Sequence, residues 1–103
     1  MDAIEADLIA AVDELAQGLR GGPGLETAAA DRLRATLRRA AEAWKASPTI
    51  SKVAANILID VASAIEGSSY SFPEAEAQRI REFSVEIASL VRDCVRVDDD
   101  VAV

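Results

Sequence analysis

Residues 80–97 read IREFSVEIASLVRDCVRV, and this stretch decides the fold class. Its apolar residues alternate steps of three and four positions: Ile80, Phe83, Ile87, Leu90, Cys94 and Val97. That spacing is typical of an a/d heptad seam, in which the apolar side chains share one face of an α-helix. We therefore expect a helix over residues 72–97, with an apolar face that the rest of the chain must cover.

A second apolar flank widens the stripe on this helix. It consists of Val85, Ala88, Val91 and Val95. One neighbouring helix is too narrow to cover both the seam and the flank, so apolar surface is left over. A second copy of the chain could cover it in a two-fold symmetric homodimer.

Three more helices are expected upstream, over residues 2–19, 25–46 and 49–66. Gly21-Gly22-Pro23-Gly24 ends the first, because glycine and proline break the helical hydrogen-bond ladder. Ser47, Thr49 and Ser51 are alternative N-caps for the third helix, and the sequence does not choose among them.

Two further signals mark the boundary between the third and fourth helices. Gly67 is expected to end the third helix in the left-handed conformation. Ser71 and Glu74 match a capping box, in which each side chain would accept a hydrogen bond from the other residue's backbone N–H. The fourth helix is therefore expected to begin at Phe72.

The third helix is apolar on nearly all sides over residues 50–65. A helix of this kind is expected to be the central element of the core, or to be half-buried by a partner. Its polar residues fall on one stripe: Asn56, Asp60, Ser63 and Gly67. We interpret this stripe as the side that faces solvent; the alternative is a polar groove in which Asp60 supplies the charge.

These segments predict an all-α fold, a compact four-helix antiparallel (up-down-up-down) bundle, because the connections between the helices are short. One domain is expected over residues 1–97, and residues 98–103 are expected to form an acidic frayed tail.

The composition argues against several chemistries. The chain of 103 residues has no histidine, which excludes His-dependent triads and the commonest zinc ligand. Its single cysteine, Cys94, is expected to pack as a small buried hydrophobe. We therefore expect no enzymatic activity, no cofactor and no metal.

The charge is strongly acidic. Eighteen acidic residues against eleven basic ones give a net charge of −7, which disfavours binding to nucleic acid or to an anionic membrane. An acidic start without a positively charged leader argues for a cytoplasmic protein. The arginines of residues 32–39 are expected to pair with the acids of the first helix if the two helices pack antiparallel.

These features predict a non-enzymatic protein–protein interaction module, in the manner of an inhibitor, immunity protein or antitoxin that binds a larger basic partner. The charge would steer association and set specificity. The candidate partner-binding residues are the acids expected on the exposed face of the first helix: Asp2, Glu5, Asp7, Asp13 and Glu14. The alternative is a homodimeric structural or scaffolding protein that assembles through the fourth helix.

Overall fold

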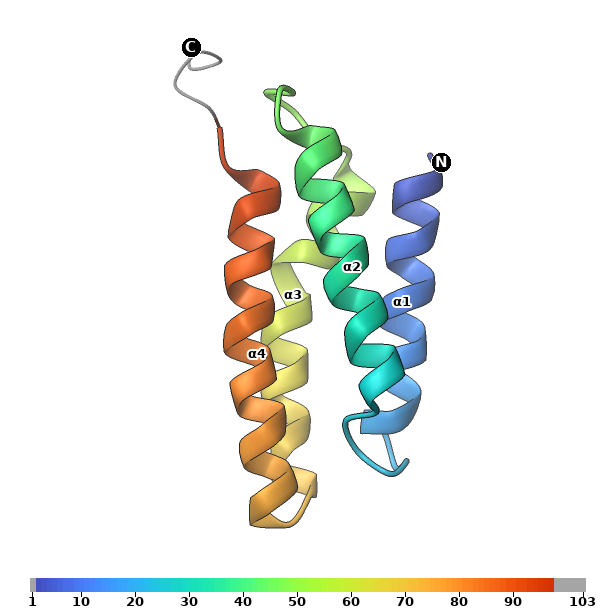
Figure 1. The fold of residues 1–103 in the computed structure, drawn as a ribbon, viewed down its shortest axis with the longest axis vertical. Coiled ribbons are helices and arrows are strands. Elements are labelled where there is room, and N and C mark those ends of the chain that lie inside the picture. Colours follow the sequence, from blue (N-terminus) through green and yellow to red (C-terminus); the bar gives the residue numbers. More distant parts are fainter. Residues whose placement is uncertain (1, 98–103) are drawn as a thin grey trace.

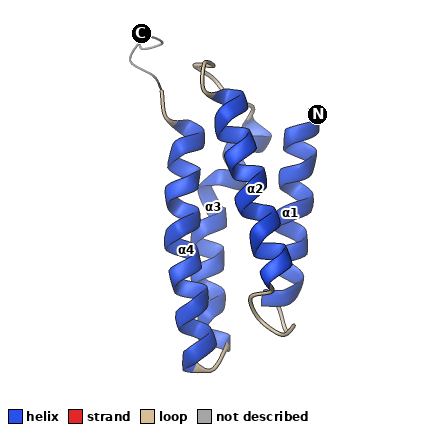
Figure 2. Ribbon diagram, viewed as in Figure 1, coloured by secondary structure: helices blue, strands red, loops and turns tan. Residues whose placement is uncertain are grey.

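The computed structural model describes residues 2–97, so the expected acidic tail lies outside the described residues. Four α-helices account for most of that range: α1 (Ala3–Leu19), α2 (Thr27–Trp44), α3 (Lys52–Ser68) and α4 (Glu74–Val95). A short 3₁₀ helix, Ser69–Ser71, joins α3 to α4. Within residues 2–97 there is no strand, and the predicted all-α four-helix bundle is confirmed (Figure 2).

The helices alternate in direction, as expected, but their order around the bundle differs from their order in the chain. α1 and α3 run one way and α2 and α4 run back (Figure 1). α2 packs against α1 and α4, and α3 packs against α4 and, less extensively, α1. The bundle therefore consists of two helical hairpins, α1–α2 and α3–α4, laid face to face.

The core draws on all four helices. Its largest apolar side chains with no exposed surface are Leu8, Leu33, Leu37, Ile80 and Ile87. Full burial of such a side chain is worth about 1.5–3 kcal/mol relative to exposure. Four of these five belong to α2 and α4, which pack closely against each other, so the tight half of the bundle lies there.

α3 is less buried than its composition suggests. Only Ala54, Leu58, Val61 and Ile65 are buried on it, whereas the side chain of Ile59 is 74% exposed. The expectation that α3 is the central element of the core is therefore wrong, since α3 lies at an edge of the bundle. Its polar stripe, over residues 56–67, is exposed and faces solvent.

Side-chain caps mark the start of α1 and α3, and a glycine-containing loop ends α1. Asp2 caps α1 by accepting a hydrogen bond of 2.8 Å from the Glu5 backbone N–H. Ser51, the last of the three candidates, caps α3 by accepting from the Ala54 N–H at 3.1 Å. Gly21 and Gly24 have φ values of +81° and +111°, a conformation that disfavours side chains and so ends α1 at this loop.

Two expectations about the α3–α4 connection are wrong. Ser71 belongs to the 3₁₀ helix, and α4 begins only at Glu74, whose carboxylate accepts from Arg81 at 2.7 Å. The capping box therefore does not form. Gly67 lies within α3 and has no positive φ, because the helix tightens directly into the 3₁₀ turn and needs no left-handed residue.

Candidate functional site

The acids of α1 were predicted to contact a partner, but two of them contact α2 instead. The Asp7 carboxylate accepts from Arg39 at 2.6 Å, and the Glu14 carboxylate accepts from Arg32 at 2.5 Å. These pairs confirm the expectation that the arginines of α2 offset charge on α1. Both pairs are about half exposed, so each contributes at most about 1 kcal/mol.

Two more of these acids make hydrogen bonds at the N-termini of α1 and α3. Glu5 is buried, with 8% of its surface exposed, and accepts a hydrogen bond from the hydroxyl of Ser51, the N-cap of α3. Its placement on the exposed face of α1 was wrong, because it borders the apolar stripe on the side facing α3. Asp2 is occupied as the N-cap. Asp13 is exposed, and its side chain makes no hydrogen bond or ion pair within residues 2–97. The five acids therefore do not form one surface.

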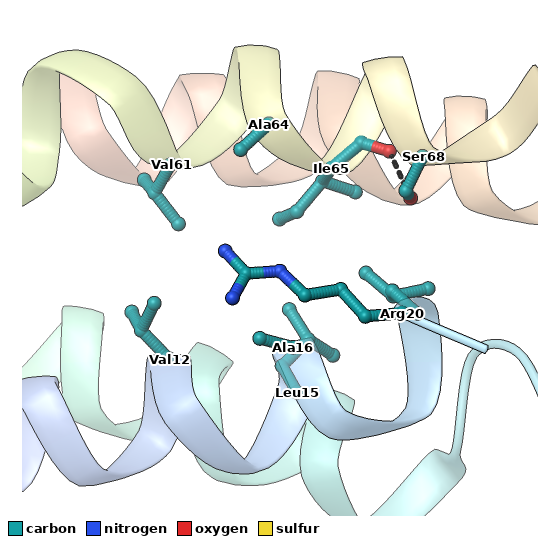
Figure 3. Close-up of a pocket in the computed structure, with 9 residues that line it drawn as sticks. Val12, Leu15, Ala16, Arg20, Val61, Ala64, Ile65 and Ser68 are labelled. Carbon is teal, nitrogen blue, oxygen red and sulfur yellow. Dashed lines mark hydrogen bonds between the residues drawn. The ribbon is translucent and has the colours of Figure 1, made fainter. Parts of the chain in front are cut away.

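An apolar groove lies between the C-terminal halves of α1 and α3 (Figure 3). Its volume is about 90 Å³. The residues that line it are Val12, Leu15, Ala16, Leu19, Arg20, Val61, Ala64, Ile65 and Ser68. It opens to solvent, so apolar side chains from outside can reach its floor.

Among residues 2–97, side-chain hydrogen bonds connect α1 with the α3 segment at one end only. Near their N-termini the Glu5–Ser51 hydrogen bond connects the two helices. Further along, the facing positions include Ala16 and Ala64, whose side chains are too short to fill the space. The result is a seam that is closed at one end of the bundle and hollow towards the other.

Helical periodicity puts two exposed carboxylates at the rims of this groove, next to its lining residues but not among them. Asp13 lies one turn before Ala16, and the same surface of α1 carries Arg20. Asp60 lies one turn before Ala64 on α3, and residues four apart share a helix face. The parallel register, with Glu5 beside Ser51, puts Asp13 and Asp60 at the same level on opposite helices.

Arg20 is the one cationic side chain that lines the groove. Its side chain points back along the groove, and its guanidinium lies between α1 and α3 near Val12 and Val61 (Figure 3). No ion pair within 4.0 Å involves Arg20 in the part of the chain that the structure describes. The aliphatic stem therefore covers apolar surface, and the guanidinium is left available.

The flank of α4 that was predicted to self-associate is divided by the fold. Val85 is 71% exposed and Val95 is 49% exposed. Ala88 and Val91 are half-buried, and Val91 packs against the core. Part of the flank is therefore used inside the bundle, and Val85 is its most accessible member.

Cys94 is buried, as expected, and its thiol lies 3.3 Å from the Leu37 carbonyl oxygen. Burial, with a smaller contribution from the charge of Asp93, raises the pKa of the Cys94 thiol to about 11. This thiol is therefore protonated near neutrality, which is unfavourable for nucleophilic chemistry.

Residues 2–97 contain no cluster of three or more Cys, Asp or Glu side chains suited to a metal ion. None of the four described helices has the length and apolar character needed to cross a membrane.

Comparison with protein-family models, with curated proteins and with solved structures finds no match to this chain.

Proposed function

We propose that this chain is a non-enzymatic interaction module that binds a larger, basic protein partner. The groove between α1 and α3 carries the proposal, because it combines an accessible apolar floor with exposed carboxylates at its rims. Apolar grooves between helices are common docking surfaces for protein segments. An inhibitor, immunity or antitoxin-like role is consistent with such binding.

The distribution of charge supports a basic partner. The acids of α1 that face α2 are offset by arginines, whereas Asp13 and Asp60 on the α1–α3 side have no described partner. Unpaired carboxylates beside an apolar surface favour a positively charged protein by raising the rate of encounter. The overall charge of −7 adds to this steering over longer distances.

Affinity capture from the native lysate at low and high salt tests the proposal. We expect one stoichiometric, basic protein that elutes in salt. With that partner purified, Asp13→Lys should slow association by about threefold or more at low salt. Recovery of the chain alone, or association rates independent of salt, would contradict it.

Asp13 is the informative acid of α1 for this experiment. Reversing Asp7 or Glu14 would break an ion pair to α2, and reversing Glu5 would leave a buried lysine beside Ser51. Loss of binding in those variants would not separate recognition from folding.

A homodimeric structural or scaffolding protein assembled through α4 is the second candidate. The exposure of Val85 and Val95 favours it. Light scattering over a range of concentrations tests it: a dimer mass that Val85→Lys converts to a monomer mass supports this function, and a constant monomer mass excludes it.

A further inference from the structure

We infer that the α1–α3 groove binds an amphipathic helix of the partner whose apolar face is bordered by lysine or arginine. This inference rests on the proposed function and deepens it, since it names the segment recognised and the surface that recognises it. The groove is elongated along two parallel helices, and a third helix laid along such a seam can bury its own apolar stripe there.

The apolar side chains on the floor of the groove account for the apolar face expected on the partner helix. Val12, Leu15, Val61 and Ile65 present branched aliphatic groups, while Ala64 leaves room between them. Leucine or isoleucine side chains spaced three or four residues apart on the incoming helix would fill this hollow. Their burial would supply the affinity, because rim charges contribute mainly to orientation and rate.

The carboxylates at the rims of the groove account for the basic residues expected along both edges of the partner helix. Asp13 and Asp60 each precede a lining alanine by one helical turn, at similar positions along two parallel helices, so a helix laid along the seam would meet a carboxylate at each edge. Arg20 indicates that this position accommodates a cation, since its guanidinium lies over the same floor (Figure 3). An incoming basic helix would displace the Arg20 side chain, which is held there by no described ion pair.

The test uses the full chain and two synthetic helical peptides of about 15 residues, near the lower length limit for a stable helix. Both carry leucines on one face; one has lysines at both edges of that face and the other has glutamates. Backbone amide shifts in the protein, followed by NMR, report where each peptide binds, and fluorescence anisotropy reports affinity. We expect the lysine peptide to shift the amides of Ala16 and Ala64, and the glutamate peptide to shift neither.

Four variants of the protein test whether the groove and its rim carboxylates bind the lysine peptide. Asp13→Lys and Asp60→Lys should each weaken binding of the lysine peptide by about three- to fivefold. Glu66→Lys is the matched control, because Glu66 is exposed on α3 but faces away from α1, and it should change affinity by less than about twofold. Ala64→Phe should abolish binding by filling the groove. Circular dichroism verifies that each variant is folded.

The Arg20→Ala variant distinguishes a basic partner helix from an acidic one. If the groove takes a basic helix, removing this competing cation should tighten binding of the lysine peptide by about threefold. If the groove takes an acidic helix, the same change should remove the attractive charge, and the glutamate peptide should be the better ligand. The second result would overturn the inference.

Three further outcomes would overturn it: shifts confined to another surface such as the Val85 region, equal binding of both peptides, or groove amides that shift only with the concentration of the protein itself. The last would identify a second copy as the occupant. A captured basic partner would keep the proposed function intact in each case. Conversely, peptide binding in the groove without any captured partner would contradict the proposed function alone.

Discussion

The carboxylate of Glu76, in the first turn of α4, accepts a hydrogen bond of 2.7 Å from the backbone N–H of Leu25, in the loop between α1 and α2. Arg79 donates to the same carboxylate at 2.5 Å. This contact joins the two hairpins at the end of the bundle where the α1–α3 groove is open. The hydrogen bond from Leu25, followed by that from Arg79, lowers the pKa of Glu76.

Glu76→Gln should lower the free energy of unfolding by about 1 kcal/mol at pH 7, because the amide oxygen accepts the same bond without the charge. The lowered pKa stabilises the fold above the ordinary value of 4.5, and this contribution is lost as the pH falls through the folded value. Urea unfolding at pH 7 and pH 3 should therefore show a difference between wild type and variant that shrinks in acid. Glu82→Gln, an exposed change on α4, is the control, and equal midpoints at pH 7 would contradict the prediction.

Gly24→Ala should destabilise the fold by about 1–3 kcal/mol, a typical cost for a side chain forced into a disfavoured backbone conformation. Gly24 has a φ of +111°, and an added Cβ would lie 2.5 Å from the Glu76 carboxylate. Gly67→Ala is the matched comparison and should have the opposite effect on stability. Gly67 is inside α3, with nothing within 4 Å of the added carbon. The substitution should stabilise the fold by about 0.5–1 kcal/mol, and thermal unfolding of both variants checks the two signs.

The Arg34–Glu86 pair should couple α2 to α4 by about 0.5–1 kcal/mol in a double-mutant cycle to alanine. It is bidentate, with Nε–Oε2 and Nη2–Oε1 distances of 2.7 Å and 2.9 Å, and Arg34 also lies over the Phe83 ring at 4.9 Å. The hydrogen bond to Arg34 lowers the pKa of Glu86.

A second cycle, on Arg32 and Glu14, serves as the comparison. This pair is more exposed and makes a single contact, so its coupling should lie within about 0.3 kcal/mol of zero. Urea unfolding of the wild type and the six variants gives both coupling energies. Equal coupling in the two pairs would show that bidentate geometry adds nothing here.

Cys94 should make the fold sensitive to alkali. Its thiol pKa rises from 9.0 to about 11 on burial, so the unfolded chain loses the proton first as the pH rises. The stabilisation is present below pH 9 and is lost progressively towards pH 11. Cys94→Ala should cost about 1 kcal/mol at pH 7 through the lost packing, and the difference from wild type should narrow above pH 9.

Thiol labelling provides an independent measurement on Cys94. A thiol-specific reagent at pH 8 should modify the unfolded chain in urea much faster than the native protein. Rapid labelling of the native protein would contradict both the burial and the raised pKa.

The sequence was sufficient to predict the helices, within about three residues at each end, because apolar spacing and glycine or proline interruptions are local signals. It was not sufficient to predict their neighbours. An apolar stripe such as Leu33, Leu37 and Ala40 shows which side of α2 faces inward, but not that α4 rather than α3 lies against it. The groove was missed for this reason, since it depends on α1 lying beside α3.

The candidate acids show a related limit. Asp7 and Glu14 lie on the edge of α1 towards α2, and Glu5 lies on the edge towards α3, so neighbouring helices determine their contacts. Asp13 lies between these two edges on the solvent-facing side of α1, and helical geometry alone would have separated it from the other three. Asp60 was singled out in a polar stripe on α3, but only the register of α3 against α1 places it at the groove.

The arrangement in two hairpins has a consequence for assembly. Each hairpin is closed by its own short connection, and only residues 45–51 pass from one hairpin to the other. If that linker straightened, the α3–α4 hairpin of one molecule could pack on the α1–α2 hairpin of another through the same contacts. Such domain swapping needs no new interface. A dimer of this chain would then leave Val85 exposed and would contain two complete copies of the α1–α3 groove.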